Sequence, residues 1–166
     1  MPFTTLAGHT QASLNLLADA VSTVHPTDTQ TFDFSTGILL PGQEPVALVQ
    51  QVADWAAAAA GRYVYYFETD ADPVALAALH AVAKDAREGA RADRKYARLF
   101  GPNCVLYVGG SSSLRTRFRE HLGYGNKAVF AMQLAHWASV IDVPVRFTAA
   151  RYALTASVEI LGALED

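Results

Sequence analysis

Apolar residues recur along much of this sequence at intervals of three and four, the spacing of one face of an α-helix. Prolines and glycines mark where such stretches stop, as at His25-Pro26 and at Gly101-Pro102. The helices that we expect lie near residues 10–24, 45–61, 72–100, 114–122, 128–140 and 157–166. The third of these is long, and we expect it to bend at Gly89.

Three shorter runs are rich in aromatic and β-branched residues, which favours strands. They are Tyr63–Phe67, Cys104–Val108 and Val143–Phe147. Because strand side chains alternate, Tyr63, Tyr65 and Phe67 should share one face, with Tyr66 on the other. Residues 27–42 are polar and turn-rich around one short apolar run, and we place no strand there.

The order of these elements predicts an α/β fold of the α+β kind. Its centre would be a small three-stranded sheet, antiparallel or mixed, flanked by helices. Residues 1–60 would form an N-terminal helical extension, and residues 61–166 would form the domain that holds the sheet. A helical insertion at about 70–101 would separate the first two strands.

The composition indicates a globular protein with the size of one ordinary domain. The chain has 166 residues, 51% of them hydrophobic, which suffices for a core without covalent staples. Its single cysteine, Cys104, excludes an intramolecular disulfide and favours a reducing compartment. No apolar run approaches the roughly 20 residues of a membrane helix, and no secretory signal opens the chain. We expect a soluble, cytoplasmic protein without membrane contact.

The charges are segregated along the chain, although their sum is only −3. Residues 84–127 hold ten of the 13 Lys and Arg residues but only four of the 16 Asp and Glu residues, a net charge of +6. The remainder carries −9. A small net charge therefore does not exclude a polyanionic partner.

Six basic residues of this segment should lie on or beside one face of the expected helix, because they follow helical spacing. They are Lys84, Arg87, Arg91, Arg94, Lys95 and Arg98. Two interpretations remain open. The face is either solvated and interleaved with Asp85 and Glu88, or it is a track that binds a nucleic-acid backbone.

The densest group of reactive side chains lies in residues 107–121, Tyr-Val-Gly-Gly-Ser-Ser-Ser-Leu-Arg-Thr-Arg-Phe-Arg-Glu-His. A strand here should end in a small-residue loop at the start of a helix, where backbone N–H groups stabilise anions. The candidate phosphate-binding residues are Gly109, Ser111 and Arg115. Arg117 and His121 are one helical turn apart, so they should project together near Tyr107. This spacing suggests a phosphodiester site.

These residues resemble the GIY-YIG endonucleases. The second half of the family motif is matched by Tyr107, Val108, Gly109, Ser111, Leu114, Arg117 and His121. The first half is similar to Tyr63-Val64-Tyr65, in which the glycine is replaced and Tyr65 takes the tyrosine position. The resemblance spans about residues 61–166 and implies a divalent-metal-dependent endonuclease that hydrolyses DNA.

The resemblance also implies a role for each matched side chain. Tyr65 would be the general base that deprotonates a water, and Tyr107 would orient water or phosphate. Arg117 would hold the non-bridging phosphate oxygens. A phenol, with a reference pKa of about 10, serves as a base only beside cations that lower it. Arg117, His121 or a basic residue of the insertion would be that neighbour.

The metal implied by the resemblance is one Mg²⁺ or Mn²⁺, held by a glutamate on a late helix. Glu165 fits that position best, and Glu159 is the runner-up. In the family the pattern continues beyond this glutamate. We therefore expect the nuclease-like domain to be truncated at its C-terminus, and the activity of the chain to depend on what is missing there.

Two other functions fit the same residues. One is a GIY-YIG-like module that has lost catalysis and binds nucleic acid or another partner. The other is an RNA nuclease or toxin of the same fold, because contacts to phosphate carry little information about the sugar. No pattern in the sequence indicates an oligomeric state. The histidines and tryptophans that we expect to pack rather than act are His80, His136, Trp55 and Trp137.

Overall fold

The computed structural model describes residues 22–89, 94–99, 101 and 103–156. Its strands are β1 (Asp28–Ser35), β2 (Arg62–Glu68), β3 (Val105–Ser111) and β4 (Pro144–Tyr152). Its helices are α2 (Val46–Ala57), α3 (Pro73–Glu88) and α4 (Leu114–Leu122), with 3₁₀ turns η1 (Thr36–Ile38), η2 (Leu134–His136) and η3 (Ala138–Val140). None of the helices in these ranges is long and apolar enough to cross a membrane.

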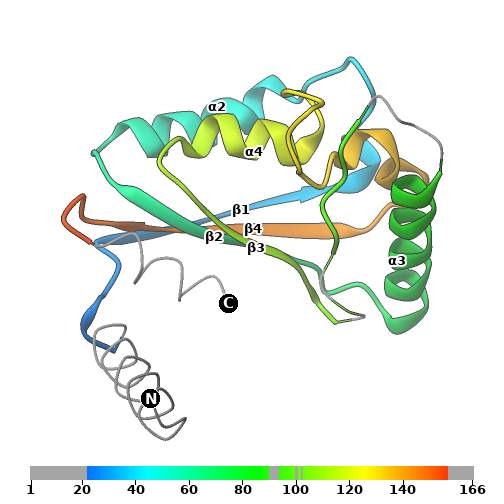
Figure 1. The fold of residues 1–166 in the computed structure, drawn as a ribbon, viewed down its shortest axis with the longest axis horizontal. Helices are drawn as coiled ribbons and strands as arrows, with labels where there is room; N and C mark the ends of the chain where they lie inside the picture. The colour runs from blue at the N-terminus through cyan, green and yellow to red at the C-terminus, as the bar shows by residue number, and fades with distance from the viewer. Residues whose placement is uncertain (1–21, 90–93, 100, 102, 157–166) are drawn as a thin grey trace, which may run out of the picture.

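The four strands form one sheet in the order β1-β4-β2-β3, and each neighbouring pair is antiparallel. Figure 1 shows α2 and α4 side by side over one face of the sheet, while α3 stands at one end of the strands. The predicted α+β class is confirmed. The sheet differs from the prediction in having a fourth strand, β1.

Strand β1 escaped prediction because little of it is buried. Its first four residues are exposed, and Phe32 and Phe34 are its buried residues. Two apolar positions are too few to establish an alternating pattern. All eight residues of β1 pair with β4, so residues within the expected N-terminal extension belong to the same sheet.

Helix α3 begins as expected but ends earlier. Asp72 caps it, since its carboxylate accepts hydrogen bonds from the N–H groups of Val74 and Ala75 at 2.8 and 2.9 Å. Pro73 follows in the first turn, where it needs no donor. At Gly89 the backbone turns extended, with ψ of 145°, and the helix ends.

The expected basic helix face is therefore wrong. Lys84 and Arg87 lie on α3, but Arg94, Lys95 and Arg98 belong to a non-helical segment, residues 94–99. Arg91 lies outside the described residues. The segment runs beside residues 127–131, with an N–H···O bond of 2.9 Å from Lys95 to Lys127 and one of 2.8 Å from Ala97 to Ala131.

Residues 128–140 do not form the helix that their apolar content predicted. They form a loop and the two 3₁₀ turns, and Gln133 adopts the left-handed region with φ of 59°. The buried residues of this stretch follow one another too closely for a single helix face. They are Ala131, Met132, Gln133, Leu134, Ala135, Trp137 and Ala138. Burial on all sides replaces the one-sided burial on which a helix prediction depends.

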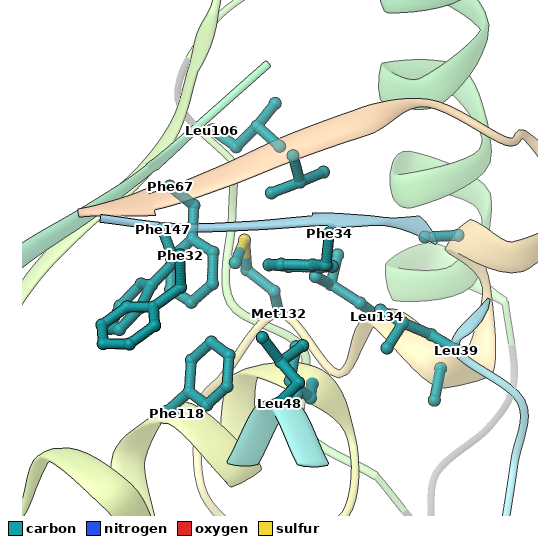
Figure 2. Packing of buried hydrophobic residues seen from close by; sticks show 14 of the residues in the cluster. Phe32, Phe34, Leu39, Leu48, Phe67, Leu106, Phe118, Met132, Leu134 and Phe147 are labelled. Atoms are coloured by element: carbon teal, nitrogen blue, oxygen red, sulfur yellow. The ribbon is translucent and has the colours of Figure 1, made fainter. Parts of the chain in front are cut away.

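Much of the core lies between the sheet and the helices α2 and α4, and it includes several aromatic rings (Figure 2). The ring of Phe147 on β4 packs against Phe67 on β2 and Phe118 on α4, with centroids 4.7 and 4.6 Å apart. The predicted alternation on β2 is confirmed, because Tyr63, Tyr65 and Phe67 are all buried. Their face of the sheet is the one that α4 covers.

Candidate functional site

The four side chains of the tyrosine, arginine and histidine motif come together from three elements. Tyr65 lies on β2, Tyr107 on the neighbouring strand β3, and both Arg117 and His121 on α4. The two tyrosine rings stack with centroids 6.4 Å apart, and the Tyr107 ring lies 4.4 Å from the imidazole. The expectation that these residues would share one place on the fold is met. We refer to these four residues as the tyrosine cluster.

The phenolic oxygen of Tyr65 is the centre of the tyrosine cluster. Arg117 donates its Nε–H to this oxygen at 3.1 Å, and Nε2 of His121 lies 3.0 Å from it. Tyr65 itself is almost completely buried, at 1% exposure. Two nitrogens from one helix therefore converge on one oxygen of the sheet.

His121 is held as a neutral imidazole. It is fully buried, and its Nδ1 accepts a hydrogen bond of 3.2 Å from the backbone N–H of Met132. Burial, followed by the nearby charge of Arg117, lowers the pKa of His121 well below its usual value. With Nδ1 accepting, the ring proton sits on Nε2, so His121 donates to the Tyr65 oxygen.

Arg117 is held by hydrogen bonds on several sides. Besides Tyr65, it donates to the Tyr107 hydroxyl at 3.2 Å, to the Glu120 carboxylate at 3.0 Å and to the Phe130 carbonyl at 2.8 Å. Burial alone would lower the pKa of Arg117, but the attraction of Tyr65 and the hydrogen bond to Glu120 raise it above its usual value. The guanidinium therefore stays charged and is fixed in orientation.

Gly109 makes room for the Tyr65 hydroxyl. It pairs with Tyr65 across the β2–β3 ladder, on the same face of the sheet. A Cβ atom at this position would lie 2.8 Å from the Tyr65 oxygen and 2.8 Å from the Tyr107 ring. A glycine is sterically required at this position of the motif, because any side chain would displace the rings of the tyrosine cluster.

The expected phosphate-binding loop is shorter than predicted. Gly109 and Ser111 belong to β3, so the loop between strand and helix shrinks to two serines. The Ser111 hydroxyl accepts from the N–H of Ser113, and no side chain caps α4. Arg115 is exposed on α4 and takes no part in the tyrosine cluster. Of the candidate phosphate ligands, Gly109 thus lies against the tyrosine cluster, whereas Arg115 lies outside it.

The predicted metal ligands, Glu159 and Glu165, lie outside the described residues. Within the described ranges no group of three or more His, Cys, Asp or Glu side chains could hold a metal ion. Glu120 is a carboxylate beside the cluster, but it is paired with Arg117. The described residues do not fit a metal ion there, and the Mg²⁺ or Mn²⁺ requirement stays a prediction.

Three partners of the tyrosine cluster were missed by sequence reasoning. Glu120 follows Arg117 by three residues, and this spacing could have indicated the ion pair. The Phe130 carbonyl and the Met132 N–H are backbone groups of a loop, and backbone groups carry no signal in the side-chain pattern. Their contribution emerges only from the folded chain.

The other basic candidates lie outside the tyrosine cluster. Arg94 donates to the side chain of the buried Gln133 at 2.7 Å, which gives it a structural role. The Lys95 ammonium lies 5.2 Å above the exposed Phe130 ring, close to Arg117 in the fold. Lys84, Arg87 and Arg98 gather elsewhere, around α3.

No protein-family model matches the chain, and no curated protein or solved structure matches it.

Proposed function

We propose that this protein is a phosphodiester hydrolase of the GIY-YIG type that cleaves DNA. One observation carries the proposal, namely that the Tyr65 oxygen accepts hydrogen bonds from both Arg117 and the neutral His121. Donors of this kind stabilise a phenolate more than a phenol. Such an oxygen is suited to take a proton from water.

The proposed reaction uses the tyrosine cluster as follows. The Tyr65 oxygen accepts a proton from a water molecule, and the resulting hydroxide attacks the phosphorus. The bond from phosphorus to the leaving 3′ oxygen breaks, and that oxygen takes a proton from solvent. Arg117 and Tyr107, the less buried members of the cluster, contact the phosphate oxygens. The proton on Tyr65 then returns to solvent.

Access to Tyr65 requires a local movement in this proposal. The phenol is buried, and the Phe130 carbonyl occupies one N–H of Arg117 at 2.8 Å. Phe130 itself is 62% exposed, so its ring is not anchored in the core. When the loop at Phe130 shifts, one N–H of Arg117 becomes available to bind phosphate, and water reaches the phenol. Glu165 or Glu159 would supply the carboxylate for a divalent ion.

The proposal is tested by nicking of supercoiled plasmid DNA in the presence and absence of Mg²⁺. We expect Tyr65→Phe and Arg117→Ala to lower the nicking rate by about 100-fold or more, as removal of general-base catalysis or charge stabilisation does. Tyr66→Phe is the matched control, because Tyr66 neighbours Tyr65 but points to the other face of the sheet. Equal nicking by all four proteins would refute the proposal.

A binding module without hydrolysis is the second candidate function. It is favoured by the hydrogen bonds that Arg117 already donates within the protein, to the Glu120 carboxylate and the Phe130 carbonyl. A gel-shift assay on the same plasmid, and on RNA of the same sequence, distinguishes the two. Retention of either nucleic acid without cleavage under Mg²⁺ or Mn²⁺ would support the binding module, while cleavage of RNA alone would identify an RNA nuclease.

A further inference from the structure

A cavity of about 200 Å³ lies between α3 and the non-helical segment that follows it, away from the tyrosine cluster. His80, Lys84 and Arg87 line it from the helix, and Arg98 lines it from the segment. Figure 1 shows α3 at one end of the sheet, beyond the strands that carry Tyr65 and Tyr107. The cavity thus has a strongly basic lining that the proposed hydrolysis does not use.

The spacing of charges on α3 explains why this lining is basic. Residues 80, 84 and 87 recur at intervals of four and three, so they share one helix face. Asp85 lies on another face, with Val82, and lines a different cavity together with Trp137. The helix therefore presents its cations and this aspartate to different surroundings.

Arg98 faces α3 from a segment with a defined path. The residue before it, Ala97, donates its N–H to the carbonyl of Ala131 at 2.8 Å, and Tyr96 is buried and bridged to Ala131. These contacts fix the backbone that carries Arg98 opposite Lys84 and Arg87. A cation held in this way needs less ordering when it binds a ligand.

The cations that line the cavity have no strong acceptor among the described residues. Nε2 of His80 is buried and has no hydrogen-bond partner in the described part of the chain. Within the described ranges the lining cations form one ion pair, between Arg87 and Glu88, at 3.6 Å and with both side chains well exposed. Exposed pairs of this kind contribute little and are readily exchanged for a better ligand. An anion with several oxygens would supply acceptors to Lys84, Arg87 and Arg98.

We propose that this cavity binds a phosphoryl group. Two guanidinium groups, an ammonium and an imidazole match the multiple oxygens and the double charge of a phosphate monoester or pyrophosphate. The cavity is large enough for such a group with part of the molecule that carries it. The group belongs either to free phosphate compounds or to the end of a nucleic acid.

Binding is measured by calorimetry with pyrophosphate, a 5′-phosphorylated dinucleotide and the same dinucleotide without its phosphate. We expect wild-type protein to bind pyrophosphate or the phosphorylated dinucleotide, and the unphosphorylated one at least about tenfold more weakly. Tighter binding of the phosphorylated dinucleotide identifies a nucleic-acid end as the source, and tighter binding of pyrophosphate identifies free phosphate compounds.

The variants Lys84→Ala and Arg98→Ala should each weaken phosphate binding about tenfold. Both residues are exposed, so the fold should persist, which thermal unfolding checks. Lys127→Ala removes the same charge outside the cavity lining and should leave the affinity unchanged. Failure of both phosphorylated ligands to bind, or equal affinity in all variants, would overturn the proposal.

The phosphate-binding proposal and the hydrolase proposal can be refuted independently. Arg117→Ala removes a member of the tyrosine cluster but no cavity residue, so it should lower the nicking rate by about 100-fold or more and keep phosphate binding. If wild-type protein binds pyrophosphate through Lys84 and Arg98 but nicks no plasmid, the cavity stands and the hydrolase proposal falls.

Discussion

The Tyr65 oxygen accepts hydrogen bonds from two residues of one helix, Arg117 and His121. Strand alternation placed Tyr65 on its face, and the spacing of four placed Arg117 and His121 on one side of α4. The spacing could not indicate how the imidazole is oriented. That depends on the N–H of Met132, eleven residues further along the chain.

The buried His121 should make stability depend on pH. The folded protein takes up a proton on this ring less readily than the unfolded chain, whose histidine pKa is about 6.5. Stability is therefore complete above pH 6.5 and is lost as the pH falls below it. The loss is at most about 1.4 kcal/mol per pH unit. Urea unfolding between pH 7.5 and 5.5 measures it.

The comparison of two histidine variants assigns this pH dependence. His121→Gln should lose stability at neutral pH and unfold with little change between pH 7.5 and 5.5. His25→Gln, at an exposed position, should keep the wild-type dependence. The lowered pKa of Glu44, held mainly by its hydrogen bond to Arg119, acts only below pH 4.5 and so outside this range. A wild-type stability that is constant over the range would contradict the prediction.

At the scale of elements, prediction succeeded where both ends were marked and one face was apolar. Helix α4 has the predicted bounds, because Leu114, Phe118 and Leu122 are buried at helical spacing and a glycine follows. Helix α3 was extended too far, since helical spacing of its basic residues continues beyond Gly89 although no buried apolar face does. Strand β1 has too short an apolar pattern to be recognised.

Gly123 provides a test of how α4 ends. Its φ of 103° lies in the left-handed region, and a Cβ there would approach the His136 ring at 3.0 Å. Gly123→Ala should therefore lower the free energy of unfolding by about 1–2 kcal/mol. Gly101→Ala is the control, because a Cβ at Gly101 meets no atom within 4 Å. Equal stability of both variants in urea would contradict a strained position.

At the scale of the whole molecule, the described cations of the +6 segment are distributed over several elements rather than one helix. They lie on α3, in residues 94–99, on α4 and, for Lys127, on the loop after α4. Charge segregation was visible in the sequence, but its distribution in space was not, because residues 90–99 read as a continuation of α3. A bound nucleic acid would have to contact several elements at once.

This distribution predicts strongly salt-dependent binding of nucleic acid. If about three phosphates are contacted, affinity should fall roughly 10- to 100-fold between 50 and 200 mM salt. Fluorescence anisotropy with a labelled DNA duplex measures the slope. Lys95→Ala should reduce the slope of log affinity against log salt concentration by the equivalent of about one phosphate contact. Arg146→Ala should leave the slope unchanged, since Arg146 on β4 is already paired with Asp33 on β1 and Glu68 on β2. Salt-independent affinity would contradict the prediction.

The order β1-β4-β2-β3 has a consequence for how the chain folds as it is synthesised. Strand β4, which ends at Tyr152, lies between β1 and β2 and pairs with both. Until it leaves the ribosome, the β2–β3 pair and β1 have open edges and no common partner. The tyrosine cluster therefore rests on a sheet that closes last, and a chaperone that shields those edges during translation should raise the yield of folded protein.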